Sequence, residues 1–248
     1  MSAIKISIII PTYGRFEPFK KLINSIKESY ISNENYEIIV VSSDSHDCEK
    51  VKWIEDQKKE INITVKIEND RKTIRSQSLY YYENIGIKNA INDWILICND
   101  DMWFEKDWYE KFLSHISDSK VYLIASHIGS VHLGIRLASI GTITINGIKE
   151  PMWLYDMSII HKSIYERVGF LDENMKWYGK GADLSLSVAF FTNEKPVLCD
   201  DVKINHDIVE ENRNSNIGNS SGNLDFSYIR QKWNKILADK HNSSYEWI

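Results

Sequence analysis

The stretch Ile4-Lys5-Ile6-Ser7-Ile8-Ile9-Ile10-Pro11-Thr12-Tyr13-Gly14-Arg15 decides the fold class. Its apolar, β-branched run is typical of a strand that is buried on both faces, and Pro11 ends that run. Apolar residues then recur at helical spacing from Phe16 to Ile26, which predicts a helix. The order strand, turn, helix is the first unit of a parallel sheet that helices cover on both sides.

The same unit recurs through the first half of the chain. Further strands are predicted at 36–41, 64–67 and 94–98, and further helices at about 48–59, 76–89 and 108–116. The pattern then loosens into a strand at 121–126 and short glycine-punctuated segments, so the C-terminal half is expected to be mixed. A mobile loop rich in Asn, Ser and Gly is predicted over 207–223, and a terminal helix over 226–238. We therefore expect an α/β fold with a Rossmann-like, mostly parallel central sheet.

Composition limits the classes of function. The 248 residues are 43% hydrophobic and 26% charged, which predicts a single domain, 1–248, with a substantial core. The net charge of −5 disfavours nucleic-acid binding. No apolar run approaches the roughly 20 residues that a transmembrane helix needs. Three isolated cysteines fit reduced thiols, which favours a cytoplasmic location. The sequence does not indicate an oligomeric state.

Ligands of open parallel sheets bind outside the carboxyl ends of the strands. Three polar clusters, 11–15, 42–45 and 99–101, follow predicted strands and should meet there. In the third cluster, Asp100 and Asp101 are adjacent carboxylates, which are costly to hold in a crevice unless a cation neutralises them. Oxygen ligands favour Mg²⁺ or Mn²⁺ shared with phosphates, and so a nucleoside diphosphate. A turn and cap before the helix near Trp108 is the alternative role for the pair.

Four motifs carry a resemblance to a known family. They are IIPTYGR at 9–15, VVSSDS at 40–45, NIGIKNA at 84–90 and ICNDD at 97–101. In order and spacing they resemble the motifs of family 2 glycosyltransferases with the GT-A fold. The resemblance covers about the first 120 residues and continues more weakly through 168–173 and 183–186 to His206.

The resemblance implies a UDP- or GDP-sugar donor bound by residues 1–120 and an acceptor bound by residues 121–248. It places Thr12, Tyr13 and Asp44 against the base and ribose, and Asp100 against the ribose or donor sugar. The full set of implied donor contacts is Pro11, Thr12, Tyr13, Arg15, Asp44, Arg75, Asn99 and Asp100. Arg71 and Lys72 are alternatives to Arg75.

The resemblance also implies the metal ligands. Asp101 closes the acidic metal motif, and His206 is a further metal contact in this interpretation, although a lone histidine is more often structural. Manganese accepts mixed nitrogen and oxygen ligands, so Mn²⁺ is favoured over Mg²⁺ if His206 binds.

The sequence allows two registers for the catalytic base. In one alignment, the acidic pair that contains the base in the family falls on Lys180 and Gly181 and is absent here. In an alignment shifted by two residues, Asp183 is itself the base. Asp183 as a helix cap is an equal alternative, and the base must then be sought at Asp156, Asp172 or Glu173. The expected acceptor contacts are Trp153, Asp156, Trp177 and Tyr178.

The expected function is metal-dependent, inverting transfer of one sugar to a hydroxyl of a glycan or glycolipid, in polysaccharide biosynthesis. A lipid-linked acceptor would be met peripherally, at the inner membrane face. Two alternatives remain: a non-catalytic module that binds sugar nucleotides or glycans, and a nucleotidyltransferase. The latter would release pyrophosphate, but the chain has no glycine-rich, basic N-terminal loop to hold a triphosphate.

Overall fold

The structure is a computed structural model, and it describes residues 4–44, 48–68, 78–116, 123–129, 139–153, 158–192, 194–206, 216–240 and 242–247. Its strands are β1 (Ile6–Thr12), β2 (Tyr36–Ser42), β3 (Ile63–Ile67), β4 (Trp94–Ile97), β5 (Met102–Phe104), β6 (Leu123–Gly129), β7 (Ser139–Ile145), β8 (Ile148–Trp153), β9 (Ser158–His161), β10 (Val197–His206) and β11 (Ser244–Trp247). Its helices are α1 (Glu17–Lys27), η1 (Asn33–Asn35), α2 (Glu49–Gln57), α3 (Leu79–Asn89), α4 (Trp108–His115), α5 (Lys162–Val168), α6 (Lys180–Phe191) and α7 (Asn216–Ala238).

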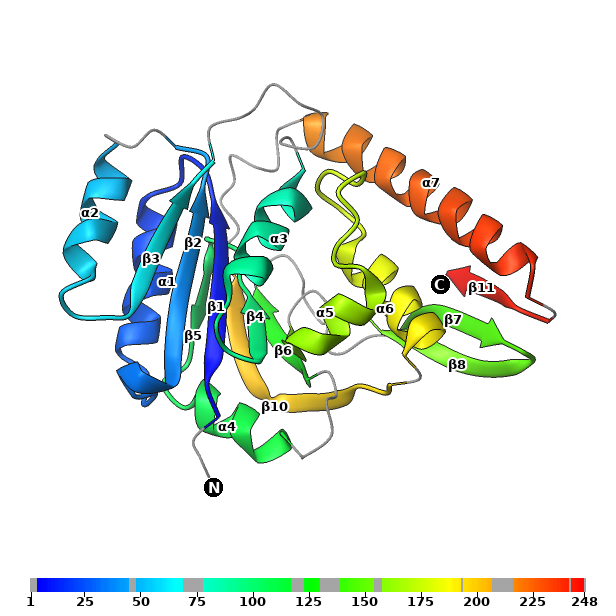
Figure 1. The fold of residues 1–248 in the computed structure, drawn as a ribbon, viewed down its shortest axis with the longest axis horizontal. Helices are drawn as coiled ribbons and strands as arrows, with labels where there is room; N and C mark the ends of the chain where they lie inside the picture. Colours follow the sequence, from blue (N-terminus) through cyan, green and yellow to red (C-terminus); the bar gives the residue numbers. More distant parts are fainter. Residues whose placement is uncertain are drawn as a thin grey trace.

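Eight of the described strands form one sheet, in the order β3-β2-β1-β4-β9-β6-β10-β5. The first four are parallel to one another, β9 is antiparallel to both of its neighbours, and β6 and β10 are parallel. The edge strand β5 runs antiparallel to β10. Six of these eight strands therefore point the same way, which confirms the predicted mostly parallel α/β sheet (Figure 1).

Helices cover both faces of this sheet. Along β1, Ile6, Ile8 and Ile10 pack into one hydrophobic cluster, whereas Ile9 packs into another. The first cluster contains apolar side chains of α1, α2 and α4, and the second contains those of α3, α5, α6 and α7. Because both faces of the strand are buried, its sequence is apolar at consecutive positions.

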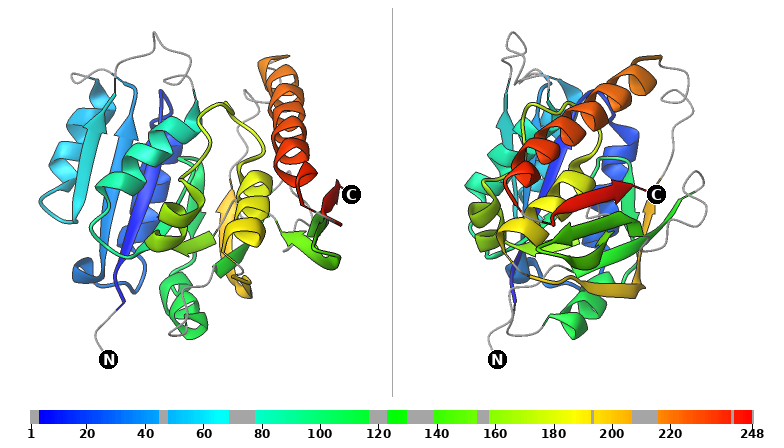
Figure 2. Two further views of the ribbon diagram at one scale, coloured as in Figure 1. Left: turned by 45° about the vertical axis from the view of Figure 1, so that its right-hand side comes forward. Right: turned by 90° about the vertical axis from the view of Figure 1, so that its right-hand side faces the viewer.

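The C-terminal half adds a small antiparallel sheet in the order β11-β7-β8. Ile143 of β7 and Met152 of β8 belong to the same cluster as the apolar faces of α6 and α7. In both views of Figure 2, α7 and this small sheet lie close to α6. The second half is mixed, as the sequence predicts.

The terminal helix corrects one prediction. It begins at Asn216 instead of 226, so 216–223 is helical and only 207–215 of the predicted loop lies outside the described residues. Ile229, Trp233 and Leu237 are buried at helical spacing and fix the C-terminal part of α7. Once those turns have formed, extending the helix through a polar stretch costs little.

Candidate active site

The carboxyl ends of three parallel strands form one edge of the sheet. Thr12 pairs with Ser42 at the ends of β1 and β2, and Ile9 pairs with Ile97 at the end of β4. The arrowheads of β1 and β2 accordingly reach the same edge in Figure 1. The three polar clusters of the sequence therefore leave the sheet side by side, apart from Ser45, which lies outside the described residues.

The acidic pair lies at this edge and is buried. Asp100 and Asp101 are 2% and 7% exposed. The Thr12 hydroxyl donates to Asp100 Oδ2 at 2.6 Å. The guanidinium of Arg15 bridges the pair, with Nη2 3.0 Å from Asp100 Oδ1 and Nη1 in contact with Asp101 Oδ2. The pair does not cap the next helix, because β5 follows it directly and Asp107 is the N-cap residue of α4.

Burial raises the pKa of Asp100 above its ordinary value. Arg15 and the Thr12 hydroxyl lower that pKa, but they offset the burial only in part. The neighbouring charge of Asp101 raises it further. Two carboxylates in this setting attract a cation strongly, because any positive charge nearby relieves both the burial and their mutual repulsion.

Asp44, at the end of β2, is held by three partners. Gly14 N donates to Oδ1 at 2.9 Å, Ser42 Oγ donates to Oδ2 at 2.9 Å, and the Lys50 ammonium pairs with Oδ2. Burial alone would raise the pKa of Asp44, but these partners, Lys50 first, hold it below its ordinary value. Asp44 is therefore a fixed, ionised acceptor at the sheet edge.

Lys50 connects the two carboxylate groups. It lies on α2, is 3% exposed, and its Nζ also donates to Thr12 Oγ1 at 2.9 Å. Since Thr12 donates to Asp100, hydrogen bonds run without a break from Asp44 to the acidic pair. Lys50 is not among the site residues that the sequence predicts. Its signal is weak, since a lysine between the apolar positions of an amphipathic helix is ordinarily solvated.

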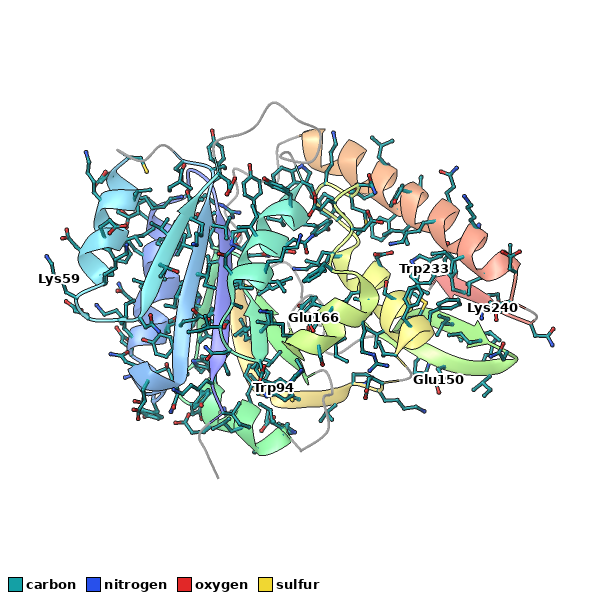
Figure 3. The ribbon with its side chains drawn as sticks, in the orientation of Figure 1. Lys59, Trp94, Glu150, Glu166, Trp233 and Lys240 are labelled. Carbon is teal, nitrogen blue, oxygen red and sulfur yellow. The ribbon has the colours of Figure 1, made fainter. Side chains whose placement is uncertain are left out.

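Asp183 is buried in the first turn of α6, where Gly179 is the N-cap residue. Lys232 Nζ lies 2.9 Å from both of its carboxylate oxygens, and the indole Nε1 of Trp233 donates to Oδ1 at 2.7 Å. Trp233 projects from α7 toward α6 (Figure 3). Asp183 thus ties α6 to α7, and it does not cap α6.

Lys180 and Glu83 form a second buried pair. Lys180 Nζ lies 2.8 Å from Glu83 Oε1, and these residues are 8% and 0% exposed. Lys180 also acts on the pKa of the Cys98 thiol, which burial raises and the lysine partly lowers. The start of α6 therefore lies near Cys98, the residue that follows β4.

The segment before α6 carries the two exposed aromatic residues of the predicted acceptor side. Trp177 and Tyr178 are 51% and 43% exposed. The carboxylate of Asp225 on α7 accepts hydrogen bonds from the backbone N–H groups of residues 176, 177 and 178, each at 2.9 Å. Figures 1 and 2 show this segment between α3 and α7.

The remaining predicted residues are described to different extents. Tyr13 is 58% exposed and follows Thr12, whose hydroxyl contacts Asp100. The backbone of His206 pairs with Met102, the residue after Asp101, so the end of β10 adjoins the acidic pair. For Trp153 the structure describes only a backbone position at the end of β8. Arg71, Lys72, Arg75 and Asp156 lie outside the described residues.

The donor set at the edge suits a hard divalent cation. Carboxylate oxygens are the ligands that Mg²⁺ and Mn²⁺ prefer, and one or two of them commonly share the ion with substrate phosphates. Within the part of the chain that the structure describes, no group of three or more His, Cys, Asp or Glu side chains could hold a metal. Asp100 and Asp101 would therefore supply part of a coordination shell.

The missed partners on α7 share one signal. Asp225, Tyr228 and Lys232 recur at spacings of three and four residues, beside the apolar series of Ile229 and Trp233. A polar stripe next to an apolar one indicates a helix whose partly buried edge bonds to another element. Tyr228 donates to Asp172 Oδ2 at 2.9 Å, which fits that reading.

Comparison with known proteins gives a family match over residues 7–139, more than half of the chain, to the model described as "Glycosyl transferase family 2". An uncharacterised glycosyltransferase of Haemophilus influenzae is 29% identical over 114 residues, which are 46% of this chain and 35% of the relative. The chain spans less than two fifths of the length of the curated relatives that it matches first.

Solved structures share the fold. S. aureus TarS 1-349 in complex with UDP-GlcNAc superposes with a TM-score of 0.66 at 16% identity, covering 83% of this chain and 59% of that chain. The mannosyltransferase PcManGT from Pyrobaculum calidifontis, in complex with GDP-Man and Mn²⁺, gives a TM-score of 0.64 at 14% identity, with 82% and 56% covered. Within the described residues, no helix is both long enough and apolar enough to cross a membrane.

Proposed function

The chain belongs to glycosyl transferase family 2, and on that premise we propose that it transfers one sugar from a nucleoside diphosphate sugar to a hydroxyl of a glycan or glycolipid. The observation that carries this proposal is the buried pair of Asp100 and Asp101, joined through Thr12 and Lys50 to the fixed carboxylate of Asp44. One edge of the sheet thereby offers sites for both a base or ribose and a diphosphate.

On the donor side, residues 1–120 bind the nucleotide. Asp44 accepts hydrogen bonds from the base or ribose, and its network keeps it ionised and in place. Tyr13, exposed at the same edge, lies against the base. Neighbours of the same fold that bind UDP-GlcNAc or GDP-Man support a UDP- or GDP-sugar as donor.

Asp101, with Asp100 beside it, would hold a divalent ion, Mn²⁺ or Mg²⁺, and His206 would contribute from the adjoining strand. Such an ion would offset the negative charge that develops on the departing diphosphate. The presence of Mn²⁺ in the neighbouring mannosyltransferase complex supports this choice of metal.

On the acceptor side, residues 121–248 bind the hydroxyl that attacks. The exposed faces of Trp177 and Tyr178 suit the apolar faces of sugar rings, and Trp153 and Asp156 are proposed to complete this surface. Asp183 is the proposed base, which takes the hydroxyl proton as the oxygen attacks from the face opposite the diphosphate, with inversion. That role requires Lys232 to give way to the acceptor.

A second candidate function follows from the start of α6. Lys180 and Gly181 stand where the resemblance places an acidic pair, and Asp183 is bound by Lys232 and Trp233. These observations favour a module that binds a sugar nucleotide or glycan without turnover.

Three free cysteines support a cytoplasmic protein, and a lipid-linked acceptor would bring it to the inner membrane face, in polysaccharide biosynthesis.

The test is release of nucleoside diphosphate from a panel of UDP- and GDP-sugars with Mn²⁺, with and without glycan acceptors. We expect release of UDP or GDP that depends on the metal and is lost in Asp101→Asn. Stabilisation by UDP or GDP without any release would contradict transfer and support the binding module. Release of pyrophosphate from a nucleoside triphosphate and a sugar phosphate would identify a nucleotidyltransferase instead.

A further inference from the structure

Arg15 holds an unusual position for a surface arginine. Its two terminal nitrogens contact different residues, one the carboxylate of Asp100 and the other that of Asp101. A single cation thus spans two adjacent carboxylates, which is the arrangement that a shared metal ion would need. While Arg15 occupies one oxygen of each carboxylate, its positive charge opposes the binding of a second cation beside the pair.

The exposure of the three side chains shows how the contact can open. The side chain of Arg15 is 37% exposed, whereas those of Asp100 and Asp101 are 3% and 8% exposed. Arg15 therefore covers the carboxylates from the solvent side. It follows Gly14, whose φ of +71° places it in the left-handed turn between β1 and α1. The arginine can swing outward on a long, partly solvated side chain, whereas the aspartates are held in the edge of the sheet.

We propose that Arg15 competes with the divalent ion for the acidic pair. Arg15 must leave Asp100 and Asp101 before the metal binds, and it then pairs with the diphosphate of the nucleotide. The last step rests on the proposed function. A guanidinium matches phosphate oxygens with two parallel hydrogen bonds, so a diphosphate offers Arg15 a replacement for the carboxylates. Metal binding releases Arg15 for the diphosphate, and the diphosphate draws Arg15 away from the carboxylates. Each ligand therefore raises the affinity of the protein for the other.

The competition is tested with Mn²⁺ alone, by calorimetric titration of the nucleotide-free protein. Arg15→Gln should bind Mn²⁺ about tenfold more tightly than the wild type or better, and Arg15→Lys should lie between them. In metal-free buffer, Arg15→Gln should bind UDP and GDP more weakly than the wild type. Circular dichroism of each variant establishes that the fold is kept.

Lys20→Gln is the matched control. Lys20 lies one turn into α1 and pairs with Glu17, so its loss removes one positive charge nearby without touching the acidic pair. We expect its Mn²⁺ affinity to stay within about twofold of the wild type. Unchanged or weaker Mn²⁺ binding by folded Arg15→Gln overturns the proposal, as does an equal gain in Lys20→Gln. Absence of Mn²⁺ binding to the wild type and to all of the variants overturns it too. Tighter Mn²⁺ binding by Arg15→Gln, with no release of nucleoside diphosphate in the transfer assay, contradicts only the proposed transfer.

Discussion

At the scale of single residues, Asp183 has two roles, one structural and one proposed. It neutralises Lys232 and accepts the indole N–H of Trp233, and we also propose it as the base. Asp183→Asn keeps the shape of the side chain but cannot take a proton. We predict a fall in transfer of about 10²–10⁴-fold, with the Kd for UDP or GDP unchanged.

The matched control for Asp183 is Asp172→Asn. Asp172 lies 2.9 Å from the same Lys232 ammonium, so its loss perturbs the same ion pair without removing the proposed base. We expect Asp172→Asn to keep transfer within a few fold. Near-full transfer by Asp183→Asn would leave that residue with a purely structural role.

Asp172 also makes stability depend on pH. Burial alone would raise its pKa, but Lys232 and hydrogen bonds from Asn174 and Tyr228 hold that pKa below its ordinary value. A lowered pKa in the folded state contributes stability above the unfolded value of about 3.9, and that contribution is lost as pH falls through the folded pKa. Urea unfolding should therefore show a smaller loss of stability below about pH 4 in Asp172→Asn than in the wild type. An identical dependence of the free energy of unfolding on pH in the two proteins would contradict this role of Asp172.

Single residues were predictable where position alone assigns them. Thr12, Asp44, Asp100 and Asp101 follow apolar strands, and parallel strands bring their carboxyl ends together. Lys50 and Lys232 were not predictable, because the Thr12 hydroxyl that Lys50 meets lies 38 residues away in sequence, and the Asp183 carboxylate that Lys232 meets lies 49 residues away. Nothing local in a helix indicates which of its lysines will meet a buried carboxylate.

At the scale of elements, Asp225 joins α7 to the segment before α6. It is 4% exposed and accepts three consecutive backbone N–H groups. Asp225→Ala should lower the free energy of unfolding by about 2–4 kcal/mol, since bonds to a charged acceptor are lost. It should also raise the acceptor KM through Trp177 and Tyr178 while leaving the donor KM unchanged.

Asp239→Ala serves as the control for this prediction. Asp239 is exposed just after α7, so its removal should change neither stability nor either KM. Equal effects of the two substitutions, or a rise in donor KM alone with Asp225→Ala, would show that Asp225 does not position the aromatic segment.

The packing of α3 on β1 depends on Gly86. A Cβ at this position would lie 2.2 Å from Ile9 Cγ2, inside van der Waals contact. Gly86→Ala should therefore destabilise the protein by about 1–3 kcal/mol, despite the higher helix propensity of alanine. Ile9→Ala removes the clashing atom. The double variant should therefore lose less free energy of unfolding, measured in urea, than the two single variants lose in sum. Additivity within about 0.5 kcal/mol would contradict the close contact.

Elements were predictable when they were long or buried on both faces. β1 and β2 are wholly buried, and their unbroken apolar runs mark them clearly. The short strands β5 and β9 have three and four residues, too few to show a period. The sequence predicts a loop at the polar start of α7, because the helical state of that start depends on the packed turns that follow it.

At the scale of the whole molecule, the parallel half of the fold is determined by local sequence, and the second half by contacts between distant segments. β10 and β6 lie side by side although about 70 residues separate them, and β11 at the end of the chain pairs with β7. Such pairings leave no mark in either strand alone. The family resemblance weakens over the same half, where acceptor contacts are proposed.

The central claim is that Asp101 and its neighbour hold a divalent ion against the phosphates of a nucleotide. The most direct measurement is a crystal structure of the protein grown with Mn²⁺ and UDP or GDP, with the ion located by anomalous scattering. We predict a manganese peak within about 2.5 Å of the Asp101 carboxylate and in contact with the diphosphate. A diphosphate bound elsewhere, with Asp101 still paired to Arg15 and no ion beside it, would contradict the account.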